Sequence, residues 1–209
     1  MAFISHAPVF IGAYLVGSIS FAIVSSRVFG LSDPRSYGSG NPGATNVLRS
    51  GSKTAAALTL VGDCLKGWLV VWAAGALGFG SVAVALAGLI AFIGHVFSVF
   101  LRFKGGKGVA TALGVAAGFN PRIALVLLGV WLLVALVSRY SSAAAITAAL
   151  VAPFATYFFS GNVAITLVML AISATLIWRH AANIRRLLDG TEGKIGKRKQ
   201  PEPAAGSEE

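Results

Sequence analysis

The chain has 209 residues, of which 56% are hydrophobic and only 11% are charged. Soluble domains carry about a quarter charged residues, so this chain lacks the polar surface of a water-soluble protein. Its seventeen Lys and Arg outnumber its seven Asp and Glu. In so apolar a chain, this excess favours anionic lipids and anionic substrates as partners rather than nucleic acid. The single cysteine, Cys64, excludes an internal disulfide.

Seven apolar segments, separated by short turns rich in Gly, Pro, Asn and Ser, are candidates for membrane-spanning helices. In chain order they are Pro8–Phe29, Ala55–Phe79, Val82–Leu101, Val109–Phe119, Arg122–Val137, Ala143–Phe159 and Val163–Ile177. The opening MAFISHAPVF has no Lys or Arg, and we interpret it as the start of a retained helix rather than a cleaved signal. A span needs roughly 20 apolar residues, so the short fourth segment leaves six spans with a re-entrant fourth segment as the alternative.

Basic residues orient the seven-span arrangement. One side would receive Arg27, Arg35, Arg49, Lys53, Arg102, Lys104, Lys107, Arg139 and the basic C-terminal region, whereas the other would receive only Arg122. Because Lys and Arg in short loops favour the cytoplasm, we expect an extracytoplasmic N-terminus and a cytoplasmic C-terminus. An even number of spans would put both ends of the chain on one side and would remove this uneven distribution of Lys and Arg.

The predicted fold is therefore all-α: a polytopic membrane protein with seven transmembrane helices. Residues 1–188 would form a single membrane domain. Residues 189–209, basic and then acidic, lose all apolar periodicity and are predicted to be a disordered cytoplasmic tail.

The first of three polar stretches on the inferred cytoplasmic side is YGSGNPGATNVLRSGSK, Tyr37–Lys53. It is dense in residues that allow positive φ angles and expose backbone amides, as anion-binding loops require. A plain flexible connection is the alternative, although a loop that only connects two helices could be about four residues long. The candidate phosphate-binding residues are Ser39, Gly40, Asn41, Gly43, Thr45, Asn46 and Arg49.

The second stretch is RFKGGKGVAT, residues 102–111. It matches neither the nucleotide-binding P-loop nor the dinucleotide fingerprint. Three glycines at the start of a predicted helix would nevertheless let backbone amides approach an anion closely, and the lysines would add charge. A basic membrane anchor would explain the lysines but not the glycines between them. The candidates are Lys104, Gly105, Gly106, Lys107 and Gly108.

The third stretch, WRHAANIRRL at residues 178–187, closes the last predicted helix. At 100° per residue, Arg179, Asn183 and Arg186 fall on one stripe, with His180 beside it. A basic helix end that satisfies the helix dipole is the alternative interpretation. Asn183 within the stripe favours recognition of a ligand over anchoring alone.

Three polar residues fall within the predicted spans. Asp63 and Lys66 lie three residues apart and could pair, as a functional site or as a structural ion pair that packs helices. His95, on the next span, is either a packing residue or a supporting member of the site. Ser141 and Ser142 lie at the cytoplasmic face and either assist the site or form a plain turn.

The chain resembles the PlsY family of bacterial acyl-phosphate-dependent glycerol-3-phosphate acyltransferases. Three motifs carry the resemblance in order: GSGNPGATN, HVFSVFLRFKGGKGVAT and RHAANIRRLLDGTE, which add Thr111 and Glu192 to the candidate residues. The resemblance implies transfer of an acyl group from acyl phosphate to sn-glycerol 3-phosphate, giving lysophosphatidate and phosphate in the first acylation of phospholipid synthesis. It also implies a bacterial inner-membrane location, seven spans, and a partner acyl-carrier-protein:phosphate acyltransferase that supplies acyl phosphate. No cofactor and no metal are expected.

In this interpretation the catalytic candidates are Lys104, Lys107, His180, Ser39 and Asn183. The candidates for binding substrate and phosphate are Gly40, Asn41, Gly43, Thr45, Asn46, Arg49, Gly105, Gly106, Gly108, Thr111, Ser142, Arg179 and Arg186, and the supporting candidates are His95, Asp63, Lys66 and Glu192. His180, His95 or the substrate phosphate itself is the candidate general base. The H-x4-D motif of other glycerolipid acyltransferases is absent, because Ile11, Phe100 and Arg185 follow the three histidines at that spacing. A membrane transporter of phosphate-bearing anions or lipids is the alternative function, although no internal repeat is visible.

Overall fold

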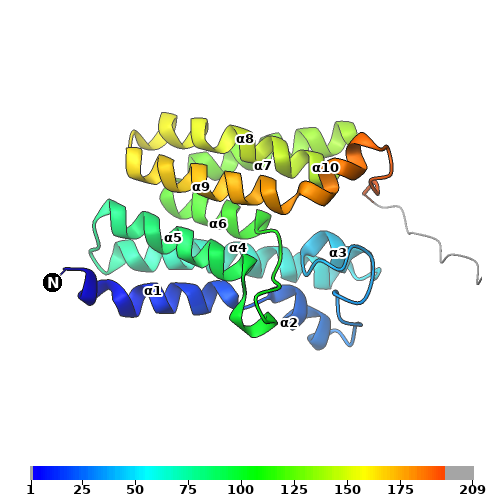
Figure 1. Cartoon of the computed structure of the whole chain (residues 1–209), viewed down its shortest axis with the longest axis horizontal. Coiled ribbons are helices and arrows are strands. Elements are labelled where there is room, and N and C mark those ends of the chain that lie inside the picture. The colour runs from blue at the N-terminus through cyan, green and yellow to red at the C-terminus, as the bar shows by residue number, and fades with distance from the viewer. Residues whose placement is uncertain (1, 196–209) are drawn as a thin grey trace, which may run out of the picture.

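The computed structural model describes residues 2–195, which form helices and connecting turns without any β-strand (Figure 1). The helices are α1 (Ala2–Ser18), α2 (Phe21–Val28), α3 (Ala44–Leu48), α4 (Lys53–Ala76), α5 (Ser81–Val96), the 3-10 turn η1 (Val99–Leu101), α6 (Val109–Phe119), α7 (Pro121–Ser138), α8 (Ser141–Ser160), α9 (Val163–Arg179) and α10 (Ala181–Leu188). This confirms the all-α prediction for the described range.

By length and composition, four helices could cross a membrane: α4, α5 together with η1, α7 and α8. The bent pairs α1–α2 and α9–α10 raise that number to six if each pair forms one span. The apolar helix α6 has 11 residues, too few for a complete span of about 20 residues. Its bounds coincide with those of the fourth predicted segment.

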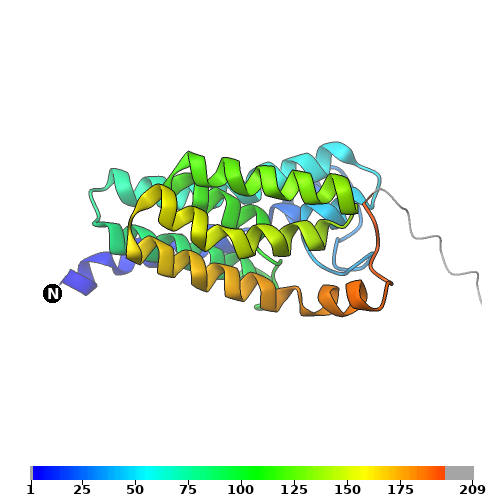
Figure 2. The same ribbon diagram turned by 90° about the horizontal axis from the view of Figure 1, so that it is seen from above.

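Helix α6 lies at the centre of the molecule, between a layer of α1, α4 and α5 and a layer of α7, α8 and α9 (Figures 1 and 2). Its closest packing is against α4, where Gly114 faces the backbone of Cys64 and Gly67 faces the backbone of Thr111. A Cβ atom at either glycine would overlap that backbone. Small residues at such crossings let apolar helices approach closely when lipid supplies no hydrophobic driving force between them.

Two predicted continuous helices are broken. The first predicted segment, Pro8–Phe29, bends by 46° between α1 and α2, and the last helix bends by 55° between α9 and α10. At the first bend the freed backbone groups find partners from distant helices: Lys66 donates to the Ile19 carbonyl, Ser98 donates to the Ser18 carbonyl, and Asp63 accepts from the Phe21 amide. Such partners make a break tolerable within an apolar bundle.

The third predicted segment, Val82–Leu101, is also interrupted. Helix α5 ends at Val96, and the chain then forms η1 and a glycine-containing turn before α6 begins at Val109. Arg102 and Phe103 both adopt the left-handed conformation, with φ angles of 52° and 62°. The turn therefore reverses sharply and brings Gly105 and Gly106 back against the end of α5.

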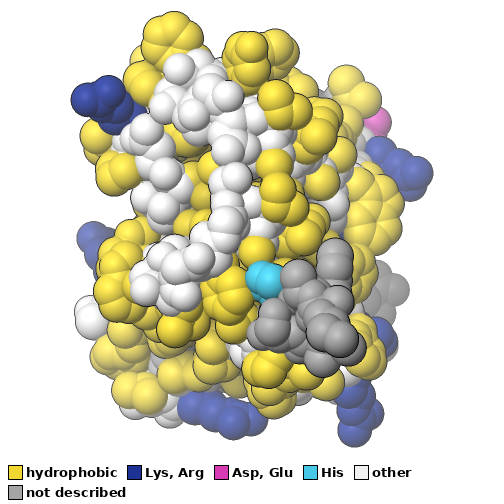
Figure 3. All heavy atoms as spheres, turned by 90° about the vertical axis from the view of Figure 1, so that its left-hand side faces the viewer, with side chains coloured by type: hydrophobic (Ala, Val, Ile, Leu, Met, Phe, Trp, Pro, Cys, Tyr) yellow, Lys and Arg dark blue, Asp and Glu magenta, His cyan; other side chains and the backbone are white. Residues whose placement is uncertain are grey.

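The polar loops gather at the end of the molecule opposite the N-terminus (Figures 1 and 2). There Thr45 hydrogen-bonds Ser141 at 3.1 Å, and the amide of Ile195 donates to the carbonyl of Arg139 at 2.8 Å. The opposite end shows mainly hydrophobic side chains and backbone, with cations towards the rim of the view (Figure 3).

Residues 189–195 return towards α8 instead of leaving the helices. They form hydrogen bonds to Ser142, Asn183 and Arg186 as well as to the Arg139 carbonyl. Polar contacts rather than apolar periodicity hold this first part of the predicted tail. The remainder of that predicted tail, residues 196–209, lies outside the described residues.

Candidate active site

A cavity of about 880 Å³ opens at the polar end and continues between α4, α6, α7, α8 and α9. Its mouth carries polar side chains from α3, the glycine turn, α8, α10 and the returning segment. Its inner wall is apolar and includes Leu60, Leu113, Trp131, Ala149 and Met169. One space thus joins a polar end to an apolar arm, which suits a ligand with a charged head and a fatty chain.

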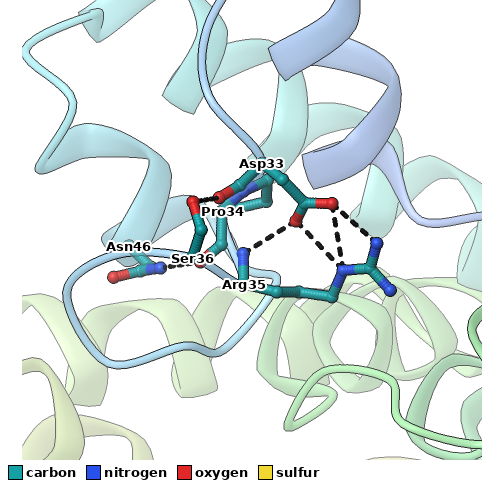
Figure 4. A network of polar contacts seen from close by, with 5 residues as sticks. All are labelled: Asp33, Pro34, Arg35, Ser36 and Asn46. Atoms are coloured by element: carbon teal, nitrogen blue, oxygen red, sulfur yellow. Dashed lines mark hydrogen bonds and ion pairs between the residues drawn. The ribbon is translucent and has the colours of Figure 1, made fainter.

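The loop before α3 is organised around Asn46, which is 2% exposed. Its side-chain amide donates to the carbonyl of Pro34 at 2.6 Å (Figure 4). It also donates to the carbonyl of Tyr37 at 3.1 Å. Its oxygen accepts from the Ser39 amide at 3.0 Å and from Arg49 at 3.3 Å. Asn46 therefore fixes the two neighbouring candidates, Ser39 and Arg49, at the cavity mouth.

The same loop is braced on its outer side. Asp33 accepts from the Arg35 guanidinium and amide, and Ser36 donates to the Asp33 carbonyl at 2.8 Å (Figure 4). The hydrogen bonds from Arg35 outweigh the small effect of burial and hold the pKa of Asp33 below its usual value. Both side chains are more than two-fifths exposed, so this pair shapes the loop more than it stabilises the protein.

Five residues from four segments form what we call the mouth cluster: Lys107, Ser142, Asn183, Arg186 and Glu192. Glu192 accepts from Ser142 and Asn183 at 2.6 Å and from Arg186 at 2.7 Å. Asn183 in turn accepts from Lys107 at 2.5 Å. The carboxylate thus orients the amide, and the amide orients the ammonium towards the cavity.

Burial and neighbouring charges set the ionisation of this cluster. Burial is the largest effect on Lys107 and lowers its pKa to about 8, against the opposing attraction of Glu192. For Glu192, burial would raise the pKa, but the hydrogen bonds from Ser142, Asn183 and Arg186 together keep it below the usual value. The cluster therefore holds an ionised carboxylate and a lysine that titrates near physiological pH.

Not all backbone amides of the glycine turn are free to bind an anion. The amides of Gly105 and Gly106 donate to the carbonyls of Val96 and His95, respectively. A Cβ atom at either position would overlap His95 or Val96, so these glycines permit close packing against the end of α5. The amides of Lys107 and Gly108 have no hydrogen-bond partner within residues 2–195.

Gly108 caps the N-terminus of α6 with a φ angle of 90°. The free amides and the helix dipole at this end favour an anion. Of the predicted cradle, Lys107 and Gly108 therefore keep free amides, whereas the amides of Gly105 and Gly106 are occupied. The reason is that α5 ends in free carbonyls, which take up the first two glycine amides.

Two predicted cations lie outside the cavity wall. Arg179 donates to the carbonyls of Gly105, at 3.2 Å, and Gly106, at 3.5 Å, so it supports the turn from behind. Lys104 is exposed, and its side chain does not line the cavity. A bend of 55° between α9 and α10 separates Arg179 from Asn183 and Arg186, the other two residues of the predicted stripe.

His180 lies at that bend, 3% exposed, and lines the cavity. Its Nδ1 is 2.8 Å from the carbonyl oxygen of Leu176. Because a carbonyl only accepts, Nδ1 carries the proton and Nε2 is the acceptor in the neutral ring. His180 thus presents an unprotonated nitrogen that can accept a hydrogen bond, in a cavity wall that also includes Lys107 and Asn183.

Asp63, Lys66 and His95 form a second group, which we call the inner cluster. The predicted ion pair between Asp63 and Lys66 is present at 2.8 Å, with both side chains 3% exposed. The Lys66 ammonium is 2.9 Å from Nδ1 of His95 and 2.5 Å from the Ile19 carbonyl. Asp63 and His95 also line the cavity.

Most predicted site residues come together at the cavity. Its wall includes Ser39, Asn41, Gly43, Thr45, Asn46, Arg49, Asp63, His95, Lys107, Gly108, Ser142, His180, Asn183 and Glu192. Gly40, Lys66, Lys104, Gly105, Gly106, Thr111, Arg179 and Arg186 are not in that wall. Thr111 is fully buried, and its hydroxyl has no partner among the described residues.

Sequence reasoning missed the apolar arm and two residues of the returning segment, Lys194 and Ile195, which line the cavity with the predicted Glu192. The alanines of α8 at positions 145, 148, 149 and 152 recur at helical spacing and were the available signal for the arm. Within residues 2–195, no group of three or more His, Cys, Asp or Glu is placed to hold a metal ion.

Comparison with known proteins gives consistent matches along nearly the whole chain. A family model described as glycerol-3-phosphate acyltransferase matches residues 7–190. A glycerol-3-phosphate acyltransferase of Aromatoleum aromaticum is 64% identical over 189 residues, covering 90% of this chain and 96% of that relative. The protein of that name from Nitrosospira multiformis is 59% identical over 190 residues, covering 89% of this chain and 94% of the relative.

Two solved structures share the fold. The crystal structure of PlsY, described as an integral membrane glycerol 3-phosphate acyltransferase in its glycerol 3-phosphate form, aligns with a TM-score of 0.86 at 41% identity. The lysophosphatidic acid form of PlsY aligns with a TM-score of 0.85 at 40% identity. Each alignment covers 92% of this chain and 96% of the solved chain.

Proposed function

Because the chain belongs to the glycerol-3-phosphate acyltransferase family, we propose that it acylates sn-glycerol 3-phosphate with an acyl phosphate as donor. The products are lysophosphatidate and inorganic phosphate. The single observation that carries the proposal is the cavity, which joins a cationic mouth with free amides to an apolar arm. An acyl phosphate has these two parts, a phosphate head and a fatty chain.

The chemistry needs little leaving-group assistance, because an acyl phosphate is a mixed anhydride. A hydroxyl of glycerol 3-phosphate attacks the acyl carbon, the bond from that carbon to the phosphate oxygen breaks, and an ester forms. The enzyme must hold two dianions close together against their mutual repulsion and neutralise the charge that develops on the leaving phosphate. Lys107, Arg49 and the free amides of Lys107 and Gly108 are the groups at the mouth that suit this task.

Hydroxyl and amide groups complete the binding of the two phosphates. Ser39, Thr45, Ser142 and Asn183 line the mouth around the cations. His180 offers its unprotonated Nε2 as the acceptor for the proton of the attacking hydroxyl. The proton then leaves with the phosphate. Arg179 supports the glycine turn from outside the cavity, and Lys104 is exposed on the same turn.

We further propose that the protein crosses the bacterial cytoplasmic membrane seven times, with α6 as a short span, its N-terminus outside and its polar mouth in the cytoplasm. Successive long helices run in opposite directions (Figure 1). The loops of the polar end carry the Lys and Arg excess that favours the cytoplasm. A cytoplasmic enzyme that makes acyl phosphate from an acyl carrier protein would then supply the donor on the correct side.

The activity is tested with purified protein in detergent, palmitoyl phosphate and labelled glycerol 3-phosphate, without added magnesium. We expect labelled lysophosphatidate to form with palmitoyl phosphate and not with palmitoyl-CoA. Formation only with palmitoyl-CoA would overturn the proposed donor. In proteoliposomes, uptake of unmodified glycerol 3-phosphate without acylation would instead support a transporter.

The orientation is tested with reporter fusions. A reporter after Glu192 should read cytoplasmic, and one inserted at the turn between α4 and α5 should read extracytoplasmic. The turn between α4 and α5 lies outside the helices, so the insertion there should leave helix packing intact. The same reading at both sites would contradict the proposed topology.

A further inference from the structure

The inner cluster contains one polar atom that the fold does not use. His95 Nδ1 contacts Lys66, but Nε2 has no hydrogen-bond partner within the described part of the chain. His95 is only 6% exposed and lines the cavity. A Cβ atom placed on Gly106 would overlap Nε2 and lie 3.0 Å from the Pro42 carbonyl oxygen. Nε2 therefore faces the space between the glycine turn and the first polar loop.

The contacts of Lys66 determine which nitrogen of His95 carries the proton. An ammonium has three hydrogens and no lone pair. Lys66 has three acceptors within reach: the Ile19 carbonyl at 2.5 Å, Asp63 at 2.8 Å and His95 Nδ1 at 2.9 Å. Each hydrogen thus has one acceptor, so Nδ1 must accept. The neutral ring then carries its proton on Nε2.

We propose that His95 binds a substrate phosphate oxygen through Nε2–H, in the tautomer that Lys66 and Asp63 impose. His95 is therefore a phosphate-binding residue and not the general base. Asp63 and Lys66 are positioning residues that act through it. The inference rests on the proposed function, because it assigns His95 to one of the two phosphates of that reaction.

The glycine turn gives the location of this phosphate. Gly106 covers the His95 ring without a side chain, and the free amides of Lys107 and Gly108 follow immediately along the chain. A phosphate bound there receives hydrogen bonds from the amides, from Lys107 and from Nε2–H of His95. His180, by contrast, presents an unprotonated Nε2 to the same cavity. The two histidines thus have opposite tautomers and opposite roles.

The first test compares three His95 variants in the palmitoyl phosphate assay. Gln can place an amide hydrogen near the position of Nε2, whereas Asn places it near Nδ1, and Leu has no donor. We expect His95→Gln to retain activity within about fivefold, and His95→Asn and His95→Leu to lose about ten- to a hundredfold in kcat/KM, as expected for a hydrogen bond to a charged group. In His95→Asn and His95→Leu, the inhibition constant of inorganic phosphate should rise by a similar factor.

A merely structural role would affect Gln and Asn alike, so equal losses in the two variants would overturn the inference. Near-normal rates in all three variants would overturn it as well. The thermal unfolding temperature of each variant in detergent is the control for folding. If the wild-type protein forms no lysophosphatidate, the proposed function has failed, independently of these comparisons.

The second test reads the tautomer directly, by nitrogen NMR of the full-length protein labelled with 15N-histidine in lipid bilayers. The chain has three histidines, and His95→Gln identifies the His95 signals. We expect an unprotonated Nδ1, a protonated Nε2, and a shift of the Nε2 signal on addition of inorganic phosphate. A protonated Nδ1, or an Nε2 signal unmoved by saturating phosphate, would overturn the inference.

The positioning role of the charged pair is tested in the double variant Asp63→Leu with Lys66→Met, which leaves no unpaired charge. The protonated population of His95 Nδ1 should rise, and activity should fall about tenfold or more. An unchanged tautomer in the folded double variant would show that Asp63 and Lys66 do not position His95.

Discussion

The inner cluster and the mouth cluster each contain a carboxylate paired with a cation, but the two pairs differ in burial and in position. In the inner cluster, Asp63 and Lys66 lie three residues apart on α4 and are nearly inaccessible. In the mouth cluster, Glu192 is 7% exposed but its partner Arg186 is 41% exposed. The inner cluster stabilises the break between α1 and α2 and contacts His95. The mouth cluster connects the returning segment to Lys107 at the cavity. In the inner cluster the charged pair is buried behind His95, whereas in the mouth cluster the charged and polar side chains surround the cavity opening.

The largest expected effect on stability comes from breaking the charge balance of the inner cluster. Asp63→Asn leaves the Lys66 ammonium without its counterion, and loss of one partner of a buried pair costs about 3–5 kcal/mol. Asp63→Leu with Lys66→Met should restore most of the free energy of unfolding but not the activity. Unfolding in detergent can be followed by the reactivity of Cys64, the single cysteine of the chain.

Asp33→Asn is the matched control, because the Asp33–Arg35 pair is exposed. Its loss should change the free energy of unfolding by no more than about 1 kcal/mol. Equal destabilisation by Asp33→Asn and Asp63→Asn would contradict the distinction between buried and exposed pairs.

The largest effect on catalysis is expected in the mouth cluster, at Lys107. Lys107→Ala removes the charge that we propose neutralises the leaving phosphate and should lower kcat by about a hundredfold or more, as for other lost charge-stabilising groups. Lys104→Ala should cost less than about tenfold, because that ammonium lies outside the cavity wall. Arg102→Ala is the control for loss of a cation in the same turn.

The sequence predicted the chemistry of this region better than its geometry. Glycines next to lysine correctly indicated a turn at the mouth, and Lys107 and Asn183 do meet there. The amides of Gly105 and Gly106 could not be assigned from the sequence, since their acceptors lie at the end of α5. That pairing depends on where α5 ends, and the apolar pattern continues past its last residue, Val96, through Phe97.

The helix breaks were missed for a related reason. Apolar composition continues through Ile19, and the basic pattern continues through His180, so periodicity shows no interruption. The partners that stabilise the first break, Lys66 and Ser98, are distant in the sequence. Glu192 was identified only through motif resemblance, because the segment that carries it has no apolar pattern.

A smaller effect is expected at Glu192. This carboxylate orients Asn183 but supplies no positive charge to the cavity. Glu192→Gln keeps an oxygen for Ser142 and Asn183 but loses the ionic contact to Arg186. Activity should fall about tenfold, consistent with loss of one charge-assisted hydrogen bond. Asp189→Asn, on the same returning segment, is the control and should leave kcat/KM unchanged. Equal losses in the two variants would show that Glu192 acts only through net charge.

The smallest expected effect is a fall of kcat/KM with rising pH. It should depend on Lys107 of the mouth cluster and not on His95 of the inner cluster. Burial lowers the pKa of Lys107 from 10.5 to about 8, so the ammonium loses its proton at a lower pH than an ordinary lysine. The charge is present below pH 8 and disappears above it, and kcat/KM should therefore be about threefold lower at pH 8.5 than at pH 7.5. Lys107→Arg should abolish this decline, since arginine stays charged throughout. His95→Gln should leave the decline in place, because His95 acts as a fixed donor; a decline that follows His95 rather than Lys107 would reverse the assignment of the two clusters.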